Sequence, residues 1–344
     1  MQASGRVVES DFARVSHVEQ GATVGHRASR NVSSRQDRRQ LRDTWMPLIV
    51  GLLALIWPSG LLATEVVILK SSDIAAYNQA INGFKATLPP HMTLTEYDLQ
   101  GDLEKGRTLA RKILASDPAL VLAVGLKAAK AAQLEIVDIP VVYSMVLDPA
   151  KNGLTTPNMT GVLIEIPLER QLSAIHSVLP QVRRLGALYD PAKTATTIAE
   201  AQRLTKRNGI ELIATPVSHE RDVPAALRNL LGPVGALWLV PDSTVLTDES
   251  LRFILNAALE QRVPVIGFSR EFARSGALLC LSVNYSDIGR QAGQLARKLL
   301  DGRLTMPMKP MPPERIDLSL NLKTARFLGI DIPKDLENRA DELY

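Results

Sequence analysis

The 344-residue sequence is poor in aromatic residues, which make up 4% of it, and it contains one cysteine. A single cysteine excludes an internal disulfide. Because Cys280 lies inside the apolar run 277–283, we expect a small buried side chain rather than a reactive thiol. The net charge is +4, and most of it comes from residues 1–45, which contain eight arginines and five acidic residues. The near-neutral, aromatic-poor remainder gives no indication of nucleic-acid binding.

Motifs for cofactor chemistry are also missing. No G-x-G-x-x-G follows a predicted strand, and neither a Walker-type phosphate loop nor a G-x-S-x-G nucleophile motif is present. The histidines beyond residue 63 (His91, His176 and His219) have no metal-ligand spacing. We therefore expect no cofactor, no metal and no enzymatic activity.

An apolar segment at 46–63 follows the arginine cluster at 35–42, and small residues end it. This layout is typical of a secretory signal peptide, with a predicted cut after Ala63. A retained membrane anchor through 46–63 is the alternative, since the segment approaches the length of a membrane span, but the Pro58-Ser59-Gly60 break favours cleavage. Residues 1–45 are predicted to be a basic, disordered leader. No cysteine lies near the cut, so we expect a free periplasmic protein rather than a lipoprotein.

From residue 64 onward, short apolar runs alternate with amphipathic helical patterns. This alternation predicts doubly wound parallel sheets with helices on both faces. The pattern restarts at the helix 168–179, so we expect two successive sheets of similar size. The predicted strands are 65–69, 92–97, 119–124, 139–145 and 159–165 in the first sheet, and 184–189, 210–214, 236–240, 263–268, 277–283 and 315–320 in the second.

Polar residues follow several of these predicted strands, and ligands of open parallel sheets bind beyond the carboxyl ends of the strands. The clearest case is 236–247, where a buried strand is followed by Asp242, Ser243 and Thr244 before Thr247 caps the next helix. Because Thr247 already serves the helix, these three residues are the first ligand-binding candidates. The same reasoning adds Ser71, Ser72, Ser144 and Ser269.

Other acids at strand ends have simpler structural explanations. Asp148 and Asp190 each precede a proline in a predicted turn. Asp73 is expected to cap a helix. Asp242 is the acid that remains as a binding candidate.

Six segments together resemble the extracytoplasmic substrate-binding proteins of ABC-type transporters, which have the type I periplasmic-binding-protein fold. The resemblance is strongest to the branch that binds aromatic or branched-chain amino acids, and it covers residues 65–344. It implies two lobes joined by a three-segment hinge, with lobe one at 64–163 plus 284–312 and lobe two at 164–283 plus 313–344. The segments are IPVVYSMVLDP (139–149), NMTGVLIEIP (158–167), LPQVRRLGALYDP (179–191), ALWLVPDSTVLT (236–247), DIGRQAGQLARKLLDG (287–302) and LNLKTARFLGIDIP (320–333).

One position departs from the family pattern. Many relatives have a Gly-Thr pair at the start of the alanine-rich helix, whereas this chain has Gly125-Leu126. The hydroxyl expected to meet a ligand carboxylate is therefore missing. Lys127, or the free N–H groups of the helix start at Leu126, could hold an anion instead.

The resemblance implies a protein that captures a small polar solute, an amino acid or a related small acid, in a cleft between the lobes and delivers it to an inner-membrane permease. Lobe one is expected to contact the anionic end and Asp242 the cationic end, and we expect a monomer. A binding protein that feeds a membrane sensor is the alternative, followed by a small-molecule enzyme on the same fold. The complete set of ligand-binding candidates is Ser71, Ser72, Leu126, Lys127, Ser144, Tyr189, Asp242, Ser243, Thr244 and Ser269.

Overall fold

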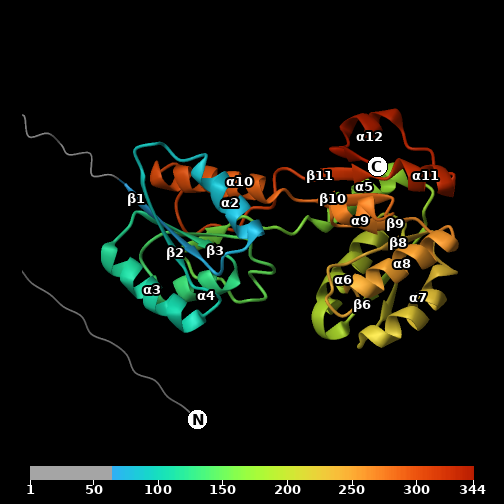
Figure 1. Ribbon diagram of the computed structural model, residues 1–344, viewed down its shortest axis with the longest axis horizontal. Helices are drawn as coiled ribbons and strands as arrows, with labels where there is room; N and C mark the ends of the chain where they lie inside the picture. Colours follow the sequence, from blue (N-terminus) through green and yellow to red (C-terminus); the bar gives the residue numbers. More distant parts are fainter. Residues whose placement is uncertain (1–63) are drawn as a thin grey trace, which may run out of the picture. The chain divides into compact units, whose positions relative to one another are not determined.

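Five parallel strands form the first sheet of the computed structural model, which describes residues 64–344 (Figure 1). The predicted leader, signal segment and cut after Ala63 lie outside the described residues. The strand order is β2-β1-β3-β4-β5, which places the earliest strand inside the sheet. The strands are β1 (Glu65–Lys70), β2 (Thr93–Asp98), β3 (Leu120–Val124), β4 (Val141–Ser144) and β5 (Met159–Gly161).

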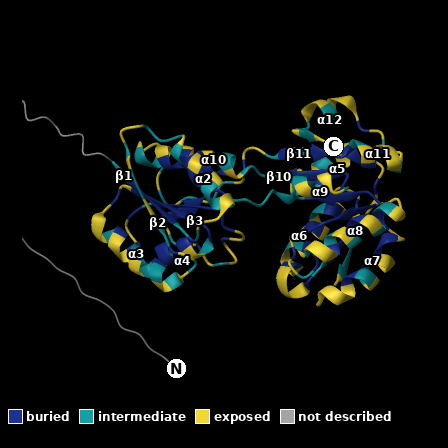
Figure 2. Cartoon of the chain, in the orientation of Figure 1, coloured by how far each residue is buried: buried dark blue, intermediate teal, exposed yellow. Residues whose placement is uncertain are grey.

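Helices cover both faces of this sheet, as its buried, continuously apolar central strands require (Figure 2). α3 (Leu103–Ser116) packs against α4 (Leu126–Glu135) over one face. α2 (Ala75–Lys85) packs against α10 (Tyr285–Leu300) over the other. The chain therefore completes the first lobe with a helix from much later in the sequence.

The contact between α2 and α10 depends on glycines, because the two backbones approach closely. A Cβ atom on Gly289 would lie 1.8 Å from the carbonyl oxygen of Ala80. A Cβ atom on Gly83 would lie 2.0 Å from the carbonyl oxygen of Ser286. Neither position has room for a side chain unless the helices separate.

The second sheet has seven strands in the order β12-β11-β10-β9-β8-β6-β7. Its strands are β6 (Arg184–Tyr189), β7 (Glu211–Pro216), β8 (Ala236–Trp238), β9 (Val265–Gly267), β10 (Leu279–Ser282), β11 (Asp317–Leu320) and β12 (Glu342–Leu343). Its helices are α5 (Leu168–Val178), α6 (Pro191–Arg207), α7 (Val223–Leu231), α8 (Asp248–Glu260), α9 (Arg270–Arg274), α11 (Leu322–Leu328) and α12 (Lys334–Arg339), with a 3₁₀ turn at Glu220–Asp222.

Two α/β lobes with parallel sheets are confirmed, with one local exception. β11 runs antiparallel to β10, because the chain leaves this sheet after β10, contributes α10 to the first lobe and re-enters from the other direction. β12, which pairs in parallel with β11, was not predicted because two residues are too few to give a periodic pattern. The exact lobe boundaries stay a prediction. Among residues 64–344, no helix combines the length and the apolar character needed to cross a bilayer.

We expect Cys280 to resist alkylation in the folded protein. The side chain is fully buried in β10, and burial raises the pKa of its thiol to about 12. The reactive thiolate is therefore nearly absent at pH 8. Iodoacetamide should label the thiol in urea but scarcely in buffer, with mass spectrometry as the readout. Equal labelling rates in the two solutions would show that this strand opens readily.

Candidate functional site

Unpartnered buried oxygens mark the carboxyl ends of several strands. Four buried side-chain oxygens of residues 64–344 have no hydrogen-bond partner. Ser144 ends β4, Ser282 ends β10, and Glu165 lies four residues beyond β5, while Thr156 lies in the loop before β5. Native proteins leave few such groups unpaired, and a bound water, ion or ligand is a common partner for those that remain. Three of the four lie where ligands bind in open parallel sheets.

Two hydroxyl groups meet above Gly125, the residue that precedes α4. Gly125 has φ +84°, and a Cβ atom there would lie 2.6 Å from the Tyr77 hydroxyl oxygen and 2.7 Å from Ser71 Oγ. Ser71 Oγ also accepts a hydrogen bond from the backbone N–H of Ala128, at 2.9 Å, which ties β1 to the first turn of α4. Ser144 lies beside this corner, because its carbonyl accepts from the Gly125 N–H. Lobe one therefore gathers hydroxyl groups at one edge.

Tyr77 is a candidate that sequence reasoning missed. Tyr77 lies on the core-facing side of α2, where its ring fits the apolar pattern of the helix, so the sequence alone indicates a core residue. The structure places its hydroxyl at the sheet edge beside Ser71, and burial raises its pKa. Only the tertiary fold brings the two residues together.

The remaining lobe-one candidates have no unpaired buried polar atom. Lys127 is exposed, and its ammonium group donates to the carbonyl of Gly101 in the loop after β2. Leu126 packs its side chain against the core. Ser72 is half-buried in a bend after β1. The expectation that Asp73 caps α2 is wrong. Ile74 is the capping position, and the Asp73 carboxylate accepts hydrogen bonds from Asn78 and Lys70.

Glu165 is half-buried, and one of its carboxylate oxygens is buried without a partner. Its Oε1 accepts a hydrogen bond from the backbone N–H of Asp148, whereas its Oε2 is buried without a partner. Burial raises the pKa of this carboxyl group. The pKa of neighbouring Tyr143 is raised to about 12 by burial and by the charge of Glu165. Sequence reasoning missed Glu165 because the predicted strand 159–165 includes it as a strand residue. In the structure β5 ends at Gly161, so Glu165 lies beyond the strand.

In lobe two, Asp242 holds two loops together. It is 4% exposed, and its Oδ2 accepts from the Asp190 N–H at 2.8 Å and from the Thr194 hydroxyl at 2.6 Å. Its Oδ1 accepts from the backbone N–H groups of Thr244 and Val245. Thr247 does cap α8, as predicted. Asp242 is therefore not needed to cap α8, but both of its carboxylate oxygens are used by the fold. A ligand role for Asp242 stays an untested prediction.

The residues around Asp242 are also engaged. The Thr244 hydroxyl donates to Asp190 at 2.6 Å, which is the main cause of the lowered pKa of Asp190. Asp190 caps α6 rather than merely forming a turn. Ser243 accepts from the exposed ammonium group of Lys193 at 2.7 Å. This edge of lobe two therefore presents the Lys193 ammonium group, which no sequence pattern singled out.

The last two candidates lie on separate elements of lobe two. Tyr189 ends β6 and is half-buried against the core. Ser269 caps α9, with its hydroxyl bonded to Glu271. The structure groups Tyr189 with the Asp242 loop through the common edge of β6 and β8, but it ties Ser269 to its own short helix. Neither hydroxyl is among the unpartnered buried oxygens.

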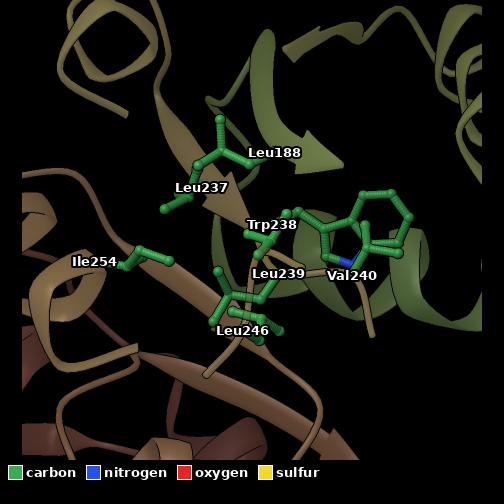
Figure 3. A pocket seen from close by; sticks show the side chains of 8 residues that line it. Leu188, Leu237, Trp238, Leu239, Val240, Leu246 and Ile254 are labelled. Atoms are coloured by element: carbon green, nitrogen blue, oxygen red, sulfur yellow. The ribbon is translucent and has the colours of Figure 1, made fainter. Parts of the chain in front are cut away.

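The hollows described in lobe two do not coincide with these candidates. Leucine, valine, isoleucine and tryptophan side chains around Leu237 and Ile254 enclose an apolar gap that has no room for a water molecule (Figure 3). Two wider hollows, of about 430 and 650 Å³, lie at the opposite edge of the sheet around Arg183 and Arg184. No group of three or more possible metal ligands occurs within 64–344. Polar side chains at the carboxyl edges are therefore the candidate site.

Known proteins match most of the chain. The family described as "ABC transporter substrate binding protein" matches residues 75–344. A protein named tyrosine-binding protein, from Clostridioides difficile, is 23% identical over 239 residues, which cover 67% of this chain and 69% of that protein. A protein from Rickettsia prowazekii of unassigned function is 24% identical over 214 residues, which cover 62% of this chain and 67% of that protein.

Two solved structures show the same fold. A ligand-free, open substrate-binding protein with adhesive properties from Clostridium difficile has a TM-score of 0.70 at 20% identity, covering 81% of this chain and 98% of that one. An ABC domain from Streptococcus pneumonia in complex with L-Trp has a TM-score of 0.57 at 19% identity, covering 82% and 99%. The family match extends over most of the two lobes. The chain thus belongs to the ABC transporter substrate-binding protein family.

Proposed function

We propose that this protein captures a small polar solute, an amino acid or a related small acid, outside the cytoplasm and delivers it to an ABC transporter permease. The family is one of substrate-binding proteins rather than enzymes. The relative named for tyrosine and the neighbour solved with L-Trp support an amino-acid ligand. Export through the segment 46–63 and release into the periplasm are parts of this proposal.

The observation that carries the proposal is the buried, unpartnered hydroxyl of Ser144. The residue is 1% exposed, so bulk water does not satisfy it. It lies beside the corner formed by Ser71, Tyr77 and Gly125. A solute with a polar end would supply the missing partner, and a purely apolar one would not. Binding that bridges both lobes would favour a closed state through its greater affinity for that state.

Differential scanning fluorimetry of the purified protein against single amino acids and small carboxylic acids tests the proposal. A ligand at 100 times its Kd stabilises the folded state by about 2.7 kcal/mol, which is readily seen as a rise in Tm. We expect at least one polar solute to raise Tm in this way. No shift with any of them, and no small molecule released from the freshly purified protein on denaturation, would contradict the proposal.

Ser144→Ala should separate binding from stability. Removing an unpartnered buried hydroxyl should leave the free energy of unfolding unchanged or raise it by roughly 1 kcal/mol. Losing one hydrogen bond to the solute should weaken binding about tenfold. Titration calorimetry and urea denaturation measure the two effects. Ser177→Ala, on an exposed turn of α5, is the control and should change neither. Unchanged affinity in Ser144→Ala would remove this residue from the site.

A further inference from the structure

Glu165 is held in a fixed position just after the first sheet. Val162 forms a bridge with Met311, and the backbone N–H of Leu163 donates to the Met311 carbonyl at 2.8 Å. The Asp148 N–H then holds one carboxylate oxygen of Glu165. The backbone on both sides of the interaction is therefore tied to lobe one, and the position of the side chain is set by the fold.

The second oxygen of Glu165 is buried and receives no hydrogen bond. The strongest influences on its pKa are burial, backbone N–H groups and the charge of Asp148, and none of these is a cation. The titratable groups that face it are Asp148 and Tyr143. A carboxylate oxygen that is buried without a hydrogen-bond donor is costly, which makes the free Oε2 of Glu165 a candidate for contact with a ligand.

The buried acids at sheet ends, Asp190, Asp242 and Asp317, have no such free oxygen. Asp242 accepts four hydrogen bonds, and Asp190 accepts from Thr244 and from the backbone of Ala192. Asp317 pairs with Arg315 and Arg270. Among these carboxylates of the described chain, Glu165 alone has an oxygen left for a new donor. This argues against Asp242 as the group that meets a cationic end.

We propose that Glu165 binds a positively charged nitrogen of the solute, so that the substrate class is amine-bearing, as amino acids are, rather than simple carboxylic acids. This inference rests on the proposed solute-binding function. An ammonium group would donate to the free Oε2 in a charge-assisted hydrogen bond, which is among the stronger polar contacts in proteins.

Matched ligands and a matched variant test the proposal. Titration calorimetry would compare each of the twenty amino acids with its deaminated acid and its decarboxylated amine, using L-tyrosine, 3-(4-hydroxyphenyl)propionate and tyramine as the reference trio. We expect binding to require the amino group. Glu165→Gln should weaken the amine-bearing ligand by 10- to 100-fold, while Glu169→Gln, on the exposed face of α5, should leave affinity unchanged.

A second readout does not depend on a ligand. Because burial raises the folded-state pKa of Glu165, its contribution to stability is present below the unfolded pKa near 4.3 and is lost as pH rises through the folded pKa. Glu165→Gln removes this loss. The Tm of the ligand-free variant should therefore exceed that of the parent protein by a margin that grows from about pH 4 to pH 7.

The outcomes separate this inference from the function on which it rests. A deaminated acid that binds as tightly as its amino acid, or an amine ligand that Glu165→Gln still binds fully, overturns the role of Glu165 and leaves the solute-binding function standing. A ligand-free Glu165→Gln variant less stable than the parent at pH 7 shows a structural carboxylate and also overturns it. Failure of every amino acid, acid and amine to bind overturns both.

Discussion

Gly289→Leu is expected to destabilise the first lobe by about 3 kcal/mol or more, because it forces α10 away from α2. Even a methyl group at this position would lie 1.8 Å from the Ala80 carbonyl oxygen, which is backbone and cannot rotate aside. Inserting extra carbon atoms into a well-packed contact costs typically 1–3 kcal/mol, and a backbone obstacle places this case at the upper end. Urea denaturation followed by circular dichroism measures the loss.

Gln294→Leu is the matched control for this prediction. It places the same side chain on the same helix, at an exposed position. A surface substitution of this kind is expected to change stability by less than about 0.5 kcal/mol. If Gly289→Leu shifted the denaturation midpoint no more than Gln294→Leu does, the close approach of α2 and α10 would not be a feature of the protein in solution.

Asp242→Ala is expected to destabilise the second lobe by about 3 kcal/mol. The change removes the acceptor for four hydrogen bonds, leaves the Asp190 N–H buried without a partner, and leaves the Thr194 hydroxyl with only its longer 3.4 Å bond to the Asp190 carbonyl. Hydrogen bonds to a charged group contribute roughly 1.5–3 kcal/mol, and a stranded buried donor costs about 1–3 kcal/mol. The loops that follow β6 and β8 should separate, which thermal denaturation would report as a lower Tm.

Ser243→Ala serves as the neighbouring control. Its hydroxyl is exposed and bonded to the Lys193 ammonium group, so its removal should cost little. A structural role for Asp242 predicts a lower Tm in Asp242→Ala, whereas a purely ligand-binding role predicts an unchanged Tm and a loss of solute binding. If Asp242→Ala kept the Tm of the parent protein but lost solute binding, the carboxylate would belong to the binding site.

The fold could be predicted from the sequence because its elements have strong periodicity. Buried strands such as β3 have apolar residues at every position, and helices such as α6 end in Asn208-Gly209, with Gly209 at φ +69°. The antiparallel course of β11 could not be predicted. It follows from the return of the chain after α10, and no local pattern encodes the direction in which a strand enters a sheet.

The candidate site was less predictable because its properties are tertiary. Position after a strand directs attention to Asp242 and Ser144, but it does not tell which of their polar atoms already bond to other residues. Glu165 falls inside a predicted strand, and Tyr77 falls on the apolar face of a predicted helix, so neither stands out as a ligand-binding candidate from the sequence. Whether a polar side chain has a structural role or is free to bind a ligand depends on the hydrogen bonds that it already makes. Those bonds are known only from the folded structure.

The late position of α10 also has a consequence for how the chain is completed during translation. α2 emerges from the ribosome long before the helix that covers it, so the apolar residues Ile81 and Phe84 stay uncovered while the second sheet is being made. We expect nascent chains that stop before residue 285 to expose this surface to chaperones. The first lobe can therefore be completed only after α10 has been synthesised.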